Sequence, residues 1–370
     1  MSAEVDVLVV GAGVVGLATG AALAKRGRSV VVLERHGAIA RETTSRSSEV
    51  IHAGLYYPEG SLKARCCVEG REAVYARCAE RGIPHRALGK IVVATSEDEI
   101  PRLEALAAQA ERNGVRDLRW LDAAEIRARE PHVAARAGFL SPRTGIVDAH
   151  ALALSFAAEG EAHGLQLALA SELVALEHVP GGWRAEARDP AGARSSVRAA
   201  AVVNAAGLAS ERVAALAGID VDAAGYRLHP CKGDYFALAP GAPLRFAGLV
   251  YPLHGRAGLG VHVTLDLGGR IRLGPDAEYV AAPRYDVDPG KSVAFAEAAR
   301  RYLPALRAEW LAPDFAGVRP KLAGPGVAFR DFVIAEEGAR GLPGLVNLVG
   351  IESPGLTAAP AIAERVAALL

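Results

Sequence analysis

The arrangement of apolar positions predicts a strand–helix–strand unit at the start of the chain. Residues 5–10 (VDVLVV) form a short run rich in β-branched residues, which is typical of a buried parallel strand. After a glycine-rich stretch, residues 17–27 (LATGAALAKRG) have the pattern of a helix that ends at a glycine. Residues 29–33 (SVVVL) form a second buried run. This order favours a parallel sheet with a right-handed crossover.

The remaining pattern mixes helices and strands. Between residues 225 and 285, short apolar runs alternate with Gly and Pro, which indicates an antiparallel sheet. Asp122 is the expected N-cap of one of the helices. We expect helices over residues 61–81, 97–113, 121–130, 149–163 and 358–370, and strands over residues 85–94, 172–177, 200–204 and 345–349.

The composition narrows the class of protein. The chain has 370 residues, of which 51% are apolar, so it is large enough for two domains. Lys plus Arg and Asp plus Glu both number 42, which gives a formal charge of zero. Because nucleic-acid-binding proteins usually carry a basic excess, we expect no nucleic-acid partner.

The cysteines indicate neither a metal site nor a disulfide framework. Cys66 and Cys67 are adjacent, which is poor geometry for a disulfide, and Cys78 and Cys231 lie in no CxxC motif. We therefore expect reduced thiols and no metal, as in a cytoplasmic protein.

Residues 7–24 are uncharged and could be mistaken for a secretory signal. Glu4 and Asp6 precede them where a signal has basic residues, so we interpret the run as folded structure. No other stretch is long and apolar enough to cross a bilayer, so we expect no transmembrane segment. The expected location is the cytoplasm, or the periphery of a membrane at its inner face.

The glycine-rich stretch has the spacing of a dinucleotide-binding turn. Gly11 permits the tight turn, Gly13 lets a pyrophosphate approach the backbone, and Gly16 lets helix and strand pack closely. Glu34 ends the second strand, where its carboxylate can accept the ribose hydroxyls and would repel the 2′-phosphate of NADP. The expected contacts are Gly11, Gly13, Val14, Val15, Gly16, Glu34 and Arg35.

The other end of the chain favours FAD over NAD. Residues 346–357 (VNLVGIESPGLT) read as a strand, a glycine-rich turn and the start of a helix. The positive end of a second helix dipole suits the pyrimidine edge of a flavin, where negative charge develops on reduction. The alternative is a plain packing turn. Residues 204–207 (NAAG) are a third, weaker point of backbone approach after a strand.

These α/β units lie at both ends and in the middle of the chain. They predict an α/β fold with an α+β insert: a Rossmann-like FAD-binding domain interrupted by a mainly antiparallel substrate domain. The expected FAD-binding domain is discontinuous and comprises residues 1–85, 148–222 and 315–370. The expected substrate domain comprises residues 86–147 and 223–314.

Four motifs together resemble the L-2-hydroxyglutarate dehydrogenase/oxidase family, within the D-amino-acid-oxidase-like FAD enzymes. They are GAGVVGLA with Glu34, SRSSEVIHAGLYYPEGSLKA at residues 45–64, LGPDAEY at residues 273–279 and GIESPGLTAAPAI at residues 350–362. The resemblance covers nearly the whole chain. It implies FAD as the cofactor, a small L-2-hydroxy acid as the substrate, and hydride transfer to flavin N5.

The resemblance also implies further FAD contacts. The segment that contains Arg46 would run along the pyrophosphate and ribityl chain, and residues 50–54 would pass beside the isoalloxazine ring. Close approach of the ring would explain Ala53 and Gly54. The implied contacts are Ser45, Arg46, Ser47, Ser48, Val174 through its backbone, Ala206, Gly207, Gly350, Gly355, Leu356 and Thr357.

Oxidation of a 2-hydroxy acid needs a base for the hydroxyl proton and a cation for the carboxylate. His52 and His262 are the candidate bases, because the pKa of histidine lies near working pH; each could instead be a structural histidine. Arg319 is the candidate for the carboxylate, because a guanidinium matches it geometrically; the alternative is a surface salt bridge. Tyr251 and Lys232 are weaker candidates for the pocket.

The chain departs from the family pattern at two positions. Leu265 stands where a basic residue is usual, which leaves a second carboxylate contact unassigned, and Ser47 stands where asparagine is common. His52 has the position of a covalent flavin attachment in some related amine dehydrogenases, which we do not expect here.

Three other functions compete with hydroxy-acid oxidation. They are oxidation of an amino acid or N-methyl amine, oxidation of glycerol 3-phosphate, and a flavin-binding sensor module without turnover. The electron acceptor (oxygen, a quinone or an electron-transfer protein) leaves no trace in the sequence.

Overall fold

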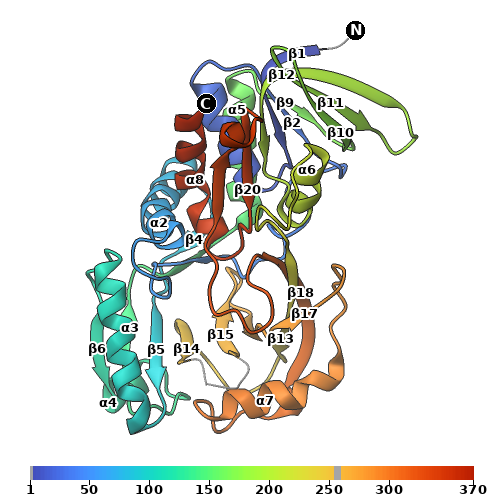
Figure 1. The fold of residues 1–370 in the computed structure, drawn as a ribbon. Coiled ribbons are helices and arrows are strands. Elements are labelled where there is room, and N and C mark those ends of the chain that lie inside the picture. Colours follow the sequence, from blue (N-terminus) through green and yellow to red (C-terminus); the bar gives the residue numbers. More distant parts are fainter. Residues whose placement is uncertain (1–2, 254–259) are drawn as a thin grey trace.

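Two large sheets organise the chain in this computed structural model, which describes residues 3–253 and 260–370. One has eight strands and the other has nine, and a small sheet of three strands accompanies them. In Figure 1 the eight-stranded sheet and its helices occupy the upper half, and the nine-stranded sheet occupies the lower half.

The eight-stranded sheet contains the predicted strand–helix–strand unit. β1 pairs in parallel with both β2 and β12, and β20 extends the parallel part beside β12. The strands are β1 (Ala3–Val10), β2 (Val30–Leu33), β9 (Gln166–Ala168), β10 (Glu172–Val179), β11 (Gly182–Arg188), β12 (Arg194–Asn204), β19 (Val333–Glu336) and β20 (Leu345–Val349).

Helices cover both faces of this sheet. On one face, α1 (Val14–Lys25), α5 (Ala149–Ala162) and α8 (Gly355–Leu369) share a hydrophobic core with the strands, and α2 (Leu62–Arg81) packs on α8. On the other face, α6 (Ser210–Leu216) joins a second cluster around Trp183 and Leu345. The central parallel strands β1, β2 and β20 are nearly continuous apolar runs because both faces of the sheet are covered there, whereas β10 and β11 include both buried and exposed residues.

The nine-stranded sheet is mainly antiparallel, as predicted. Only β14 and β5 pair in parallel within the part of the sheet that the structure describes. Helices α3 (Ile100–Arg112), α4 (Ala123–Arg129) and α7 (Ser292–Arg300) pack on it. Its strands are β5 (Lys90–Ala94), β6 (Arg119–Asp122), β7 (Ala137–Ser141), β13 (His229–Leu238), β14 (Leu249–Pro252), β15 (His262–Leu265), β16 (Ile271–Gly274), β17 (Glu278–Tyr279) and β18 (Leu311–Lys321).

The third sheet has three short strands that pair only with one another among the described strands. It consists of β3 (Val50–Ile51), β4 (His85–Arg86) and β8 (Gly145–Val147). Short 3₁₀ helices complete the described elements: η1 (Glu97–Glu99), η2 (Gly207–Ala209), η3 (Pro289–Lys291), η4 (Ala308–Trp310) and η5 (Glu337–Arg340).

The expected fold class is confirmed, while several element boundaries were wrong. The predicted strand over residues 85–94 is two strands, and the predicted helix from residue 121 begins after Asp122, which caps it in a capping box with Glu125. α8 begins three residues earlier than expected. β18 runs across residue 315, where we placed a domain boundary, and the division into domains stays a prediction.

Candidate functional site

A cavity of about 450 Å³ lies where the two large sheets meet. It opens at the carboxyl ends of β1, β2 and β20, which is where ligands bind in open parallel sheets. Residues from β13, β14, β15 and β18 of the second sheet form its other wall. The size suits a bound small molecule.

The turn after β1 is built for close backbone approach. Gly11 has φ of 107°, and a Cβ on Gly16 would lie 1.9 Å from the carbonyl oxygen of Gly11. α1 has Gly13, which has no side chain, as its N-cap and no acidic residue in its first turn, and the hydroxyl of Thr44 accepts from the amide of Val14 at 3.1 Å. Gly11, Gly13, Val14 and Val15 line the cavity, whereas Gly16 does not. The start of α1 can therefore receive an anion without steric or charge conflict.

Glu34 lies at the cavity wall with both oxygens engaged by the backbone. Its Oε2 accepts from the amide of Ala12 at 2.8 Å and its Oε1 from the amide of His36 at 2.9 Å. A carboxylate has further lone pairs, so these bonds orient Glu34 and still leave it able to accept ribose hydroxyls. Arg35 also lines the cavity, and it pairs with Glu42 at 2.7 Å.

The segment after β2 follows the cavity, with one exception. Arg46, Ser47 and Ser48 line it, but the hydroxyl of Ser45 is exposed and donates to the carbonyls of two preceding residues. The guanidinium of Arg46 lies 4.0 Å from the ring centroid of Tyr285, which orients it across the two sheets.

The explanation offered for Ala53 and Gly54 was wrong. Neither residue lines the cavity. Gly54 has φ of 106°, and a Cβ there would lie 2.8 Å from the side chain of Val68 on α2. The glycine is therefore required by a turn that packs on α2, while Val50 and His52 are the residues of this segment that reach the cavity.

The later segments contribute some of the expected residues. Ala206, Gly207, Gly355 and Leu356 line the cavity. Val174 and Gly350 do not line it; near Val174 the lining residues are Ser171, Glu172 and Leu173.

Thr357 does not line the cavity either, but it holds His52 in place. Its hydroxyl accepts from the backbone amide of His52 at 3.0 Å and donates to the carbonyl of Val50 at 3.3 Å.

His52 faces the cavity as a neutral imidazole. Its Nε2 lies 3.2 Å from the hydroxyl of Ser353, and its Nδ1 has no hydrogen-bond partner among the described residues. Burial, and secondly the charge of Lys90, lowers the pKa of His52 from 6.5 to about 3. The imidazolium form is therefore strongly disfavoured here.

His262 lines the opposite wall, and its tautomer is fixed by the backbone. Its Nδ1 lies 2.9 Å from the carbonyl oxygen of Gly260, so Nδ1 carries the proton and Nε2 carries the lone pair. Its ring stacks on Tyr251, with 3.6 Å between centroids and 23° between planes. Tyr251, a weaker candidate, thus lies in the cavity wall as expected.

Arg319 lines the cavity from β18. Its Nε and Nη2 donate to the carbonyls of Cys231, Lys232 and Asp276, and Nη1 has no hydrogen-bond partner among the described residues. A Cβ on Gly233 would lie 3.2 Å from Nη2, so this glycine makes room for the guanidinium. The surface salt bridge considered as its alternative role is absent from the described contacts.

Lys232 and Leu265 do not reach the cavity. Lys232 is 1% exposed and pairs with Asp234 at 2.7 Å, so its side chain is not a substrate contact. Leu265 belongs to the hydrophobic core of the second sheet. The departure from the family pattern at Leu265 therefore changes the core and not the described lining of the cavity.

Residues 6–369 match the family of FAD dependent oxidoreductases known as DAO. The chain belongs to this family. The L-2-hydroxyglutarate dehydrogenase, mitochondrial, of Arabidopsis thaliana is 40% identical over 405 aligned residues, which cover 98% of this chain and 83% of that protein. The human protein of the same name is 36% identical over 74% of this chain and 60% of its own length. The match thus spans less than two thirds of the human protein.

The fold has close counterparts among solved structures. The L-α-glycerophosphate oxidase of Mycoplasma pneumoniae, with FAD bound, superimposes with a TM-score of 0.86 at 25% identity, covering 99% of this chain and 94% of that chain. The recognised resemblance and the fold class are therefore both confirmed.

The residues around the cavity of this oxidoreductase fit FAD, the cofactor of its family. The glycine turn, the N-terminal end of α1 and the start of α8 all line the cavity. FAD bound there would supply the hydride acceptor that side chains lack.

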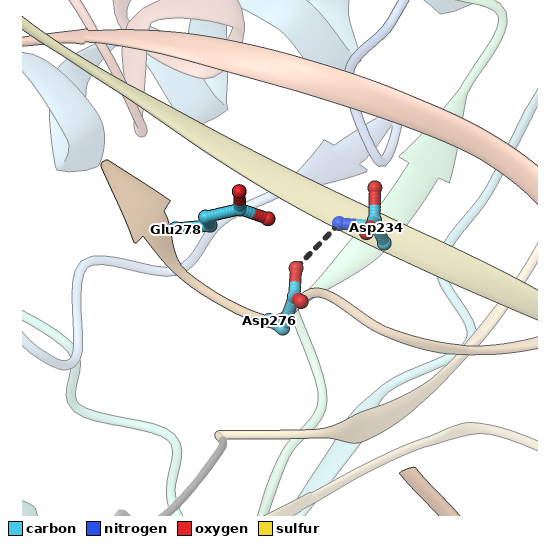
Figure 2. Close-up of side chains that lie close together, drawn as sticks. All are labelled: Asp234, Asp276 and Glu278. Atoms are coloured by element: carbon cyan, nitrogen blue, oxygen red, sulfur yellow. Dashed lines mark hydrogen bonds between the residues drawn. The ribbon is translucent and has the colours of Figure 1, made fainter. Parts of the chain in front are cut away.

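A cluster of three carboxylates lies next to Arg319 and resembles a metal site. The ligand atoms of Asp234, Asp276 and Glu278 lie within 4.8 Å of one another (Figure 2). The ammonium of Lys291 donates to all three, at 2.7, 2.9 and 2.8 Å. This lysine occupies the place of a cation, so the cluster is an ion-pair network that braces β13 and β17.

Several residues at the site were not predicted from the sequence. Glu352 lines the cavity and is buried between two lysines: Lys63 at 2.8 Å and Lys321 at 3.2 Å. Burial alone would raise the pKa of Glu352, but the lysines outweigh it and hold the pKa below its usual value. Thr44 accepts from the amide of Val14, and Lys90 lies buried behind the cavity. A charged residue that begins a fully apolar strand run was the available signal for Lys90.

Proposed function

We propose that this oxidoreductase converts an L-2-hydroxy acid, L-2-hydroxyglutarate first of all, into the 2-oxo acid. The observation that carries the proposal is that Arg319, His52 and His262 face one cavity that also holds the dinucleotide turn, with Nε2 of His262 directed away from its backbone partner. The names of the plant and human relatives support the choice of substrate.

In this proposal, Arg319 binds the substrate carboxylate through Nη1, while the bonds of Nε and Nη2 fix its direction. A histidine accepts the hydroxyl proton as the α-hydrogen leaves as hydride. His262 is the favoured base, because its proton on Nδ1 leaves Nε2 as the acceptor. His52, whose imidazolium is disfavoured, is the weaker base and lies on the side of the cofactor segment. All three residues keep their proposed catalytic roles.

The FAD contacts are proposed residue by residue. Those that line the cavity are Gly11, Gly13, Val14, Val15, Glu34, Arg35, Arg46, Ser47, Ser48, Ala206, Gly207, Gly355 and Leu356. Gly16, Ser45, Val174, Gly350 and Thr357 do not line it, and we assign them supporting roles in the turns and backbone around the cofactor.

The test is an anaerobic reduction of the purified holoenzyme. We expect L-2-hydroxyglutarate to bleach the flavin absorbance and the D-enantiomer to leave it unchanged. A H262Q variant should retain FAD and bleach at least about a hundredfold more slowly, as is typical for loss of a general base. A flavin spectrum that L-2-hydroxyglutarate does not change would overturn the substrate, and a sensor module would show no bleaching by any substrate.

Glycerol 3-phosphate is the second candidate, because the M. pneumoniae oxidase shares the fold so closely. A phosphate dianion is expected to need several cations at the substrate wall. Arg319 is the arginine that lines the cavity from β18. The other arginines that line it, Arg35, Arg41, Arg46 and Arg212, come from the segment after β2 and from α6, on the side of the first sheet. The geometry thus favours a carboxylate, and the same bleaching assay with glycerol 3-phosphate decides.

An amino acid or N-methyl amine is the third candidate. Its carboxylate would suit Arg319 equally, but at neutral pH its amine is charged and has a proton to lose before oxidation. Sarcosine and glycine in the same assay distinguish this case.

The acceptor and the place of action are also proposals. We propose the cytoplasm, or the inner face of a membrane, with oxygen, a quinone or an electron-transfer protein as acceptor. All four cysteines are buried and free, which supports a reducing compartment. Within the described residues, no helix is long and apolar enough to cross a membrane. The plant and human relatives are mitochondrial by name, so cell fractionation is the decisive measurement.

A further inference from the structure

Lys90 is a buried lysine that no part of the proposed chemistry uses. It begins β5, is 1% exposed, and its Nζ has no hydrogen-bond partner among the described residues. The other buried lysines differ, because Lys63 and Lys232 each pair with a carboxylate. A buried ammonium without a partner costs stability, so its position calls for an explanation.

The ammonium of Lys90 lies against two aromatic rings of the cavity wall. Its Nζ is 4.7 Å from the ring centroid of Tyr56 and 4.4 Å from that of Tyr251. Both tyrosines line the cavity, and Tyr251 also stacks on His262. A cation over an aromatic face is stabilised by the ring quadrupole, which offsets part of the cost of burial.

We propose that Lys90 is a positioning residue for the proposed oxidation: its ammonium, held against Tyr56 and against the Tyr251 ring that stacks on His262, adds to burial in keeping the imidazoles of His52 and His262 in their neutral, proton-accepting form. Lys90 does not line the cavity, so it acts through the field and through the stacked tyrosine. This inference rests on the proposed function, because the neutral form of an imidazole matters for catalysis only if that imidazole accepts a proton.

The pKa of Lys90 lies in the range that this role requires. Burial lowers its pKa from 10.5 to about 7, with Cys67 opposing the shift. Lys90 therefore keeps its charge below neutral pH, which is the range in which an ordinary imidazole takes up a proton. The same charge, after burial, is the second cause of the low pKa of His52. Above neutral pH an imidazole is neutral without help.

Other polar groups face the same region and bear on the titration. Cys67 on α2 donates to the carbonyl of His52, and Arg71 on α2 donates to the carbonyl of Ala53. Several polar or titratable side chains surround the two imidazoles. They are Tyr56, Tyr57, Cys67, Arg71, Tyr251, His262, Glu352 and Ser353. Arg71 is a cation among these groups, and Arg319 is a second cation in the cavity wall; neither is replaced in the variants below.

The experiment compares the neutral variants K90M and K90Q with the charge-keeping variant K90R. The histidine ring nitrogens are labelled with ¹⁵N in each FAD-loaded protein and titrated by NMR, with H52Q and H262Q to assign the signals. This readout needs no turnover. FAD content and melting temperature are measured for each variant, and either neutral variant that folds and holds FAD is sufficient.

We expect at least one of the two histidines to titrate about one pH unit higher in K90M and K90Q, the size expected for a unit charge nearby at an effective dielectric constant of about 20. K90R should titrate like the wild type. The acidic limb of the pH profile of kcat/KM should move in the same direction. Unchanged titration of both histidines in the neutral variants would overturn the proposal. If the wild type oxidises no hydroxy acid, the proposed function fails, while the NMR comparison still reports whether Lys90 controls the histidines.

Discussion

Tyr251 and His262 stack at 3.6 Å between ring centroids, and each comes from a different strand of the second sheet. β14 and β15 are neighbours, paired through Val250 and Val263. The histidine is therefore held by its ring face as well as by the bond from Nδ1 to Gly260. Two restraints on one imidazole fix the direction of Nε2, which is the atom that our proposal assigns to the substrate hydroxyl.

This stacking gives the first prediction. Replacing Tyr251 with Ala should lower kcat/KM by about tenfold to a hundredfold, because a loosened base loses its alignment with the substrate. Y251F keeps the ring and is the matched control, which should retain most of the activity. Steady-state kinetics with L-2-hydroxyglutarate measures both variants. Equal losses in Y251A and Y251F would mean that the hydroxyl, and not the ring, is what matters.

The second prediction concerns Arg319. In R319M the substrate carboxylate loses its cation, so we expect kcat/KM to fall by about a hundredfold, equivalent to about 3 kcal/mol. R319K should recover only part of the loss, because an ammonium lacks the planar fork. FAD content should stay unchanged in both variants. A substrate analogue without the carboxylate should be oxidised equally by wild type and R319M; a residual difference would point to a role of Arg319 other than carboxylate binding.

The sequence was sufficient for the layout but not for the contacts within the cavity. The turn from Gly11 to Gly16 was predictable because the spacing encodes backbone geometry. His262 and Arg319 could be proposed as site residues from the family resemblance, but not shown to meet: β15 and β18 come together only through long-range strand pairing. Lys232 was misassigned because nothing local reveals that Asp234 neutralises it.

Gly54 is a second position at which the sequence did not reveal the tertiary contact. The glycine was attributed to close approach of the flavin ring, whereas its φ of 106° and the packing of the turn on α2 account for it. The side chain of Val68, on α2, explains the glycine, and that helix returns to the turn only in the folded chain. The sequence pattern can indicate that a position is constrained, but the residue that imposes the constraint is known only from the tertiary packing.

The third prediction tests the dinucleotide turn. In G16A the added Cβ would lie 1.9 Å from the carbonyl of Gly11, so β1 and α1 have to separate. We expect a loss of at least about 3 kcal/mol in unfolding free energy, at the upper end for overpacking, and much weaker retention of FAD. Gly37 is the control, since a Cβ there meets no atom within 4 Å. Chemical denaturation and flavin absorbance measure the two variants; equal behaviour of G16A and G37A would contradict the close packing.

The fourth prediction concerns the pH dependence of stability. Folding lowers the pKa of Lys90 from 10.5 to about 7, so between these values the unfolded chain binds more protons than the folded one. The unfolding free energy contributed by Lys90 therefore rises with pH across this window. K90M lacks the contribution, so the wild type should gain stability relative to K90M from about pH 7 to about pH 9. Denaturation curves at several pH values give the difference, in which the titration of groups that Lys90 does not influence cancels. A constant difference from about pH 7 to about pH 9 would mean that burial does not lower the pKa of Lys90 as described.

The fifth prediction concerns the lysine at the centre of the carboxylate cluster. The three carboxylates raise the pKa of Lys291 against the effect of burial, so Lys291 carries its charge at any working pH. In K291M, Asp234, Asp276 and Glu278 lose this shared cation, and we expect a loss of about 3–5 kcal/mol in stability, as for a broken buried ion pair.

The same variant distinguishes charge from packing. The carboxylate oxygens of Asp234, Asp276 and Glu278 lie close enough together to bind one ion. Ca²⁺ should therefore recover part of the melting temperature that K291M loses, and should leave the melting temperature of the wild type unchanged. K25M, which removes an exposed lysine, controls for the loss of a positive charge in general. If Ca²⁺ has no effect on K291M, the remaining partners of the cluster, Lys232 on Asp234 and Arg284 on Glu278, are sufficient to balance its charge.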